Sequence, residues 1–197
     1  MADEGFVVVS IGYRLSTVAK YPAALTDVQT AVRYVRRNAA ALKIDSMRMA
    51  AYGLSAGGYL AAALGVRPMP DRSGRLDIFS SRVQRVADWY GRTNFTLPQT
   101  EGVDCAVDFL GKPRTAETMR FFEEASITPY VDENSAEFYI VHGTADKQVL
   151  PIHSTELHDS LRRLNRPSFL LWMTGARHGF IDGKGWEKTR DFLRKLK

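Results

Sequence analysis

The sequence predicts an α/β fold in which a mostly parallel sheet of about five strands is flanked by helices. Short apolar runs of strand length alternate along the 197 residues with longer stretches whose apolar residues recur at helical spacing. Such alternation is typical of strands joined by crossover helices, which make neighbouring strands parallel. The chain contains no internal repeat, and we expect one domain over residues 1–197.

The expected strands differ in how clearly the sequence marks them. Residues 6–11 read Phe-Val-Val-Val-Ser-Ile, a continuous and largely β-branched run that predicts a strand buried on both faces. The other expected strands are residues 48–52, 83–90, 138–141 and 169–173. Residues 92–137 break the alternation, and we expect them to form a small excursion over the edge of the sheet where the strands end. Its prolines are Pro98, Pro113 and Pro129.

Helices with one apolar face are expected between the strands. One follows Pro22, and another follows Ser55, where alanine and glycine suit close packing on a sheet. A third helix precedes the last strand, and a fourth closes the chain. Their expected inward positions are Leu25, Val28, Val32 and Val35, then Leu157, Leu161 and Leu164, and finally Trp186, Thr189, Leu193 and Leu196.

Composition narrows the function classes. The 45% of hydrophobic and 25% of charged residues are ordinary for a globular protein, and no apolar run approaches the ~20 residues of a membrane span. The start of the chain has no basic and apolar leader, so a cytoplasmic location is expected for the chain as given. The net charge of +5 comes from arginines and lysines on the polar faces of expected helices, which indicates a solvated surface rather than nucleic-acid binding.

Cysteine usage excludes two further kinds of site. Cys105 is the sole cysteine, so the chain has neither an intramolecular disulfide nor a metal site built from several cysteines. We expect Cys105 to be a small buried or half-buried apolar residue. His153 and His158 are five residues apart on a helix and do not share a face well enough to hold a metal ion. We therefore expect no metal and no cofactor.

Ser55 is the candidate nucleophile. It lies in Gly53-Leu54-Ser55-Ala56-Gly57, a G-x-S-x-G pattern with an expected strand before it and an expected helix after it. Such a turn exposes a strained serine at the helix N-terminus, where main-chain N–H groups face developing negative charge. The alternative is a plain glycine-rich turn with an incidental serine. The main-chain N–H of Ala56 is the expected oxyanion donor.

A serine hydroxyl needs a base and an acid that orients the base. Asp146 follows one expected strand in His142-Gly143-Thr144-Ala145-Asp146, and His178 follows the next in Gly175-Ala176-Arg177-His178-Gly179. Because parallel strands end at one edge of the sheet, these loops are expected to meet at Ser55. Asp182 is a rival orienting acid, but it lies only four residues after His178. His142 is expected to make a structural hydrogen bond, and Tyr90 and Val149 are expected either to line the substrate pocket or to belong to the core.

Together these motifs resemble the α/β-hydrolase superfamily, in its acetyl-esterase-like and feruloyl-esterase-like branch. The resemblance rests on the Tyr13-Arg14-Leu15-Ser16 and Tyr21-Pro22-Ala23-Ala24-Leu25 segments, Asp27, the Gly53–Gly58 turn and the Asp146 and His178 loops. It implies a serine carboxylesterase that hydrolyses short-chain, acetyl-like esters, such as those of a carbohydrate, through an acyl-enzyme. The open alternatives are a peptidase or amidase with the same residues, and a weakly catalytic binding or assembly protein.

The chain departs from this family at its start. The resemblance implies further N-terminal strands and a His-Gly-Gly loop with additional oxyanion donors, but His-Gly-Gly occurs nowhere in the sequence. One implied strand belongs between residues 6–11 and 48–52, so we expect an N-terminally reduced hydrolase fold. Three explanations stay open: a fragment of a longer product, whose location is then unknown, a directly closed smaller sheet, or a homodimer that covers the exposed sheet edge.

Overall fold

The centre of the fold is a parallel sheet. The computed structural model describes residues 1–67, 76, 78–97, 99 and 104–196, and within these ranges the sheet has four strands in the order β1-β2-β3-β4. They are β1 (Ala50–Leu54), β2 (Arg85–Trp89), β3 (Glu137–Gly143) and β4 (Ser168–Met173). In register, Leu54 lies beside Trp89, Trp89 beside Val141 and Val141 beside Leu171. The strands therefore end together at one edge.

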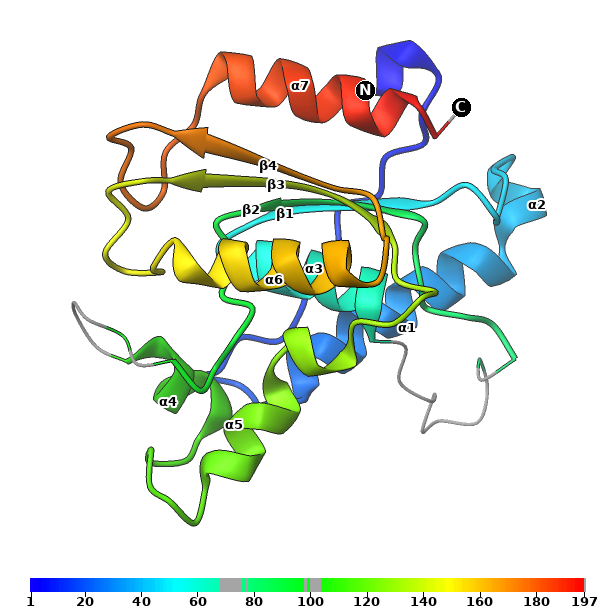
Figure 1. Cartoon of the computed structure of the whole chain (residues 1–197). Helices are drawn as coiled ribbons and strands as arrows, with labels where there is room; N and C mark the ends of the chain where they lie inside the picture. The colour runs from blue at the N-terminus through cyan, green and yellow to red at the C-terminus, as the bar shows by residue number, and fades with distance from the viewer. Residues whose placement is uncertain (68–75, 77, 98, 100–103, 197) are drawn as a thin grey trace.

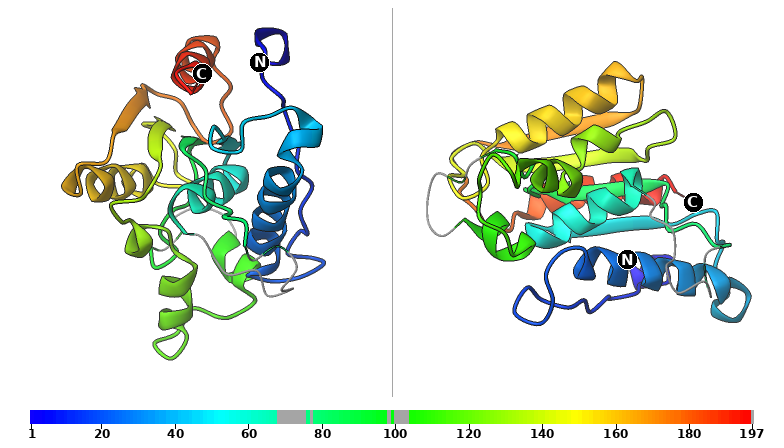
Figure 2. Two further views of the ribbon diagram at one scale, coloured as in Figure 1. Left: turned by 90° about the vertical axis from the view of Figure 1, so that its right-hand side faces the viewer. Right: turned by 90° about the horizontal axis from the view of Figure 1, so that it is seen from below.

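Helices cover both faces of this sheet, which gives three layers (Figure 1). The helix α7 (Gly183–Arg194) covers one face, whereas α1 (Ala23–Arg37), α3 (Ala56–Val66) and α6 (Ile152–Arg163) cover the other. The shorter helices are α2 (Ala39–Leu42), α4 (Cys105–Leu110), α5 (Met119–Ala125) and the 3₁₀ turns Ala2–Glu4 and Thr128–Tyr130. The two chain ends lie near each other, where Arg194 donates hydrogen bonds to Glu4 (Figure 2).

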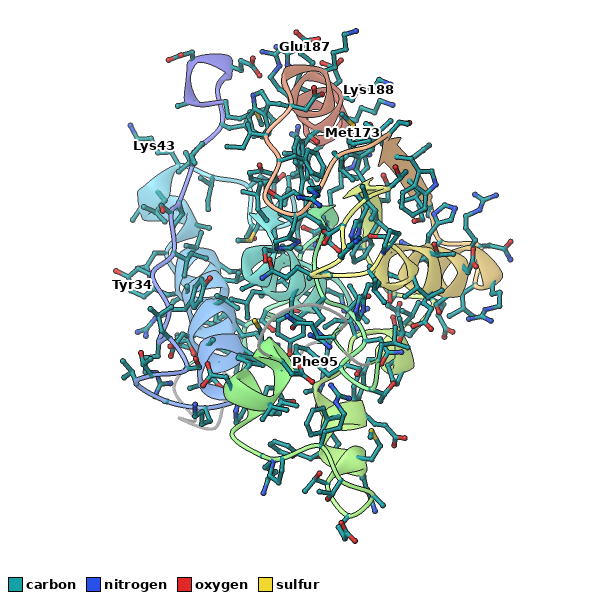
Figure 3. The ribbon with its side chains drawn as sticks, turned by 90° about the vertical axis from the view of Figure 1, so that its left-hand side faces the viewer. Tyr34, Lys43, Phe95, Met173, Glu187 and Lys188 are labelled. Atoms are coloured by element: carbon teal, nitrogen blue, oxygen red, sulfur yellow. The ribbon has the colours of Figure 1, made fainter. Side chains whose placement is uncertain are left out.

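Apolar spacing explains the three long amphipathic helices. The predicted stripe of α1 is buried at all four of its positions, while Tyr34 points outward and is 59% exposed (Figure 3). On α7, Glu187 and Lys188 lie on the outer face, and Thr189 accepts a hydrogen bond from Trp89 Nε1 at 2.9 Å. The predicted face of α6 is correct at Leu157 and Leu161, which are buried.

Two of the predicted inward positions lie outside the helices to which they were assigned, and the prediction of burial is wrong for Leu164. Leu164 caps the C-terminus of α6 and is 42% exposed, because the chain leaves the helix there toward β4. Leu196 lies beyond the last residue of α7, but it still faces inward and lines the groove described below. Each helix therefore ends before the apolar spacing in the sequence does.

The prediction of a buried strand at residues 6–11 is also wrong. The segment has no strand structure, and the side chains of Val7, Val8 and Val9 are 54%, 63% and 47% exposed. A strand needs a partner to satisfy its main-chain groups, and no hydrogen bond in the described part of the chain engages the main chain of residues 7–13. The sheet consequently has four strands rather than about five.

A groove of about 680 Å³ separates this segment from β1. One wall is formed by residues 5–11 and the other by β1, whose Tyr52 is 39% exposed. Apolar side chains line the remaining sides: Val28, Val32, Leu60 and Leu64 from α1 and α3, and Trp186 and Leu193 from α7. The free edge of β1 therefore faces an apolar space and not another strand.

Residues 92–137 contain α4 and α5, which extend below the sheet (Figure 1). Phe95 lies between these helices and the sheet, where its ring packs on Tyr59 of α3 (Figure 3). Pro98, predicted to help break the alternation, lies outside the described residues. Cys105 is exposed at the start of α4, so the prediction that it is buried or half-buried is wrong. No helix in the described ranges combines the length and apolarity that crossing a bilayer requires.

Candidate active site

Ser55 lies in a sharp turn between β1 and α3. Its main chain has a φ of 53°, a left-handed value that L-residues rarely adopt, and its N–H donates to the carbonyl of Trp89 at 2.9 Å. Gly53 makes this turn possible, because a Cβ there would lie 2.1 Å from the carbonyl oxygen of Gly57. At Gly57 a Cβ would meet nothing within 4 Å. The second crowded glycine is instead Gly58, which faces Asp88.

Three loops bring the predicted residues together at the sheet edge. Ser55 Oγ lies 2.8 Å from His178 Nε2, and His178 Nδ1 lies 2.7 Å from Asp146 Oδ2. A carboxylate only accepts hydrogen bonds, so Nδ1 carries the proton and Nε2 is left to accept the hydroxyl proton of Ser55. The side chain of Asp146 is fully buried, whereas that of His178 is 15% exposed. The arrangement provides a hydroxyl with a base in contact.

Hydrogen bonds keep the Asp146 carboxylate ionised. Burial by itself raises the pKa of this carboxyl, but hydrogen bonds from His142, His178 and the main chain of Val149 outweigh it and hold the pKa well below its usual value. Oδ1 accepts from the main-chain N–H groups of Gln148 and Val149 at 3.0 and 2.9 Å. Asp146 is therefore an oriented anion when His178 takes a proton.

Tyr90 packs against the base. Its ring centroid lies 5.0 Å from that of His178, and its hydroxyl donates to the carbonyl of Phe180 at 3.0 Å. Tyr90 has a φ of 44° and is only 2% exposed. Burial raises the pKa of its phenol to about 12, so it stays a neutral donor. Tyr90 thus fixes the loop that carries His178.

The structure separates the other predicted candidates. Asp182 caps α7 through a hydrogen bond from Gly185 at 2.7 Å and is not the partner of His178. Ala56 is the first residue of α3, where a main-chain N–H has no acceptor within the helix. Val149 is 7% exposed and acts through its main chain on Asp146, and its predicted contact with substrate, like that of Tyr90, stays a prediction.

The remaining histidines have separate partners. His153 Nδ1 accepts from the main-chain N–H of Asn94, and its burial lowers the pKa of the ring to about 3. His158 Nδ1 pairs with Ser168 Oγ at 2.8 Å. Within the residues that the structure describes, no group of three or more histidine, cysteine or acidic side chains is placed to hold a metal ion.

Sequence reasoning missed one residue beside the site, Asp88, and one contact of another, His142. Asp88 is completely buried below the turn and accepts one hydrogen bond from the Gly91 N–H, while its Oδ2 has no hydrogen-bond partner among the residues that the structure describes. His142 makes the expected structural hydrogen bond, with Ser154 Oγ at 2.6 Å, and its Nε2 also lies 3.3 Å from Asp146 Oδ2. The spacing of His142 four residues before Asp146 is a signal for the second contact, but nothing in the sequence marks Asp88.

A parallel sheet with a strained serine after one strand, an aspartate after the third and a histidine after the last defines an α/β hydrolase. A sequence model of the family described as BD-FAE matches residues 1–161. The chain belongs to this family of α/β hydrolases.

Known esterases are similar over most of this chain. Esterase LipC of Mycobacterium tuberculosis is 30% identical over 192 residues, which are 93% of this chain and 48% of LipC. A truncated carbohydrate esterase from gut microbiota superposes with a TM-score of 0.84 at 27% identity, over 95% of this chain and 73% of that one. A bifunctional GH43-CE protein of Bacteroides eggerthii gives a TM-score of 0.87 at 30% identity, over 98% and 30%. The chain spans about half the length of LipC. It spans a smaller part, about 40%, of two other curated esterases that it matches.

Proposed function

We propose that this protein is a serine carboxylesterase that hydrolyses short-chain, acetyl-like esters. The observation that carries the proposal is the continuous hydrogen-bonded series Ser55–His178–Asp146, with separations of 2.8 and 2.7 Å. The names of the similar proteins support ester bonds as the target, and one of them is called a carbohydrate esterase. A small acetylated carbohydrate is therefore the substrate class to test first.

In the proposed reaction, Ser55 Oγ attacks the ester carbonyl carbon while His178 Nε2 takes the hydroxyl proton. The tetrahedral intermediate places its negative oxygen at the N–H of Ala56. The bond to the leaving alcohol then breaks, and His178 returns the proton to that oxygen, which leaves an acyl group on Ser55. Water attacks the acyl group with His178 again as base, and the carboxylic acid leaves as Ser55 regains its proton.

The oxyanion donors limit the expected rate. Ala56 offers one main-chain N–H, and the His-Gly-Gly loop that would supply others has no counterpart in the sequence. Loss of one such donor costs on the order of 10²–10³ in rate. For residues 1–197 by themselves, we therefore expect turnover of p-nitrophenyl acetate to be measurable but slow.

Hydrolysis of p-nitrophenyl acetate by the purified chain tests the proposal. We expect Ser55→Ala to lower kcat/KM by about 10⁴-fold or more, down to the buffer rate, because Ser55 is the one nucleophile that pairs with His178 among the described residues. A fluorophosphonate probe should add its mass to the peptide that contains Ser55 in the wild type and not in this variant. Activity that survives Ser55→Ala unchanged would contradict the proposal.

The two aspartates provide a matched control. We expect Asp146→Asn to lower kcat on the order of 10⁴-fold, because the amide cannot hold the required tautomer of His178. Asp182→Asn should leave the rate unchanged, since asparagine caps a helix as well as aspartate does. A larger loss in Asp182→Asn than in Asp146→Asn would show that the orienting acid was assigned wrongly.

A further inference from the structure

His142 is a buried imidazole that the proposed reaction does not use. It lies near the end of β3, is completely buried, and so cannot touch a substrate. Its Nε2 lies 2.9 Å from the carbonyl oxygen of Val149 and 3.3 Å from Asp146 Oδ2, and its Nδ1 lies 2.6 Å from Ser154 Oγ. Each ring nitrogen therefore has a partner, and one of the partners is the aspartate of the site.

The partners fix the tautomer of His142. The carbonyl of Val149 has no proton to give, so Nε2 must carry the hydrogen and donate it. Nδ1 of the neutral ring is then an acceptor, and Ser154 donates its hydroxyl hydrogen to it. A single N–H is consequently shared between the Val149 carbonyl and the Asp146 carboxylate.

Asp146 Oδ2 thus faces two imidazoles. One is His178 at 2.7 Å, and the other is His142 at 3.3 Å. A carboxylate oxygen that accepts a second hydrogen bond holds its position more firmly, but it stabilises a positive charge on the first partner less strongly. The same contact can therefore both orient Asp146 and moderate its effect on His178.

We propose that His142 is a positioning residue, whose Nε2–H anchors Asp146 Oδ2 and weakens the stabilisation that Asp146 gives to protonated His178. The inference rests on the proposed function. Other titratable groups also face this pair: Asp88 on β2 and His153 on α6 interact electrostatically with His142, and Tyr90 after β2 contacts His178. The test therefore replaces only the side chain of His142 and leaves those groups in place.

The variants His142→Gln and His142→Asn separate this role from packing. The glutamine amide reaches the position of Nε2 and can replace the donor, whereas the asparagine amide reaches only the position of Nδ1. In His142→Asn we expect kcat to fall about tenfold with KM within twofold, because Asp146 loses its anchor. The midpoint of the acid limb of kcat/KM should rise by about 0.5–1 pH unit, and His142→Gln should restore both.

Two further measurements keep the inference testable. If His142→Asn does not fold, Ser154→Ala weakens the same donor from outside the ring, and we expect a smaller rise of the midpoint. If the wild type hydrolyses no ester, the Cε1 proton of His178 followed against pH by NMR reports the same midpoint without turnover. An unchanged midpoint in folded His142→Asn, or equal losses in both His142 variants, would overturn the inference. Activity that persists in Ser55→Ala would instead overturn the proposed function.

Discussion

Two buried carboxylates near Ser55 show how single residues acquire opposite properties in one fold. Hydrogen bonds from several donors hold the pKa of Asp146 well below its usual value despite its burial. Within the described part of the chain, Asp88 accepts a hydrogen bond only from the N–H of Gly91, and burial raises its pKa from 3.8 to about 6, against the smaller opposing effects of His142 and Gly91. The number of hydrogen-bond donors that reach a buried carboxyl group decides whether its pKa is lowered or raised.

Asp88→Asn tests this difference through stability. The folded state binds the Asp88 proton more tightly than the unfolded state, so its contribution is fully present below about pH 4 and is lost as pH rises through about 6. A difference of about 2 pH units corresponds to roughly 3 kcal/mol in the free energy of unfolding. Relative to the wild type, Asp88→Asn should therefore become more stable between pH 4 and pH 8.

Urea unfolding of both proteins at several pH values measures this difference. Ser55→Ala is a suitable control, because the replaced hydroxyl does not titrate in this range and its stability difference from the wild type should not follow Asp88. A stability difference for Asp88→Asn that stays constant from pH 4 to pH 8 would show that Asp88 is not buried as an acid.

The residues of the site were largely accessible from the sequence, since Ser55, Asp146 and His178 each follow an apolar run at a place where α/β folds build sites. Asp88 could not be predicted, because it lies inside an expected strand and its close contact with Gly58 and Gly91 arises only in the folded chain. The burial of a residue such as Asp88 depends on contacts with residues that the chain brings together only when it folds.

At the level of secondary-structure elements, the β1–α3 turn depends on Gly53 more than on Gly57. The main chain of Gly57 approaches the α-carbon of Gly53 so closely that no side chain fits there, whereas Gly57 itself has open space around it. The G-x-S-x-G pattern treats both positions alike. The structure distinguishes them because Gly53, near the end of β1, packs directly against the main chain of the first turn of α3.

Gly53→Ala and Gly57→Ala form a matched pair. We expect Gly53→Ala to destabilise the fold by about 3 kcal/mol or more and to abolish activity, because a backbone shift is needed and it displaces Ser55. Gly57→Ala should change stability by no more than about 1 kcal/mol, in the stabilising direction, since alanine favours a helix. Thermal melts by circular dichroism measure both, and similar losses in the two variants would contradict this account of the turn.

At the scale of the whole molecule, the groove between β1 and residues 5–11 is the main departure from an even three-layer fold. Apolar side chains from α1, α3 and α7 line it, and the main chain of residues 7–13 has no hydrogen-bond partner in the described part of the chain. The expectation that a second copy covers the free edge of the sheet stays a prediction, which light scattering of the purified chain tests.

Hydrogen exchange should reveal the uneven stability of this region. We expect the main-chain amides of residues 7–13 to exchange close to the rate of an unstructured chain, while those of β3, paired on both sides, are protected. Protection of residues 7–13 equal to that of β3 would show that the segment pairs with a strand in solution. Equal protection in a dimeric sample would favour pairing between copies.

We could predict the fold class, the amphipathic helices and the order in which serine, aspartate and histidine follow their strands from the sequence. Apolar spacing and glycine position, on which these predictions rest, are local properties. Three features are visible only in the folded chain: residues 6–11 lie outside the sheet, Asp88 is buried, and His142 shares Asp146 with His178. A β-branched run becomes a strand only when another strand lies beside it. Whether a buried carboxyl group is ionised depends on hydrogen-bond donors that are distant in the sequence.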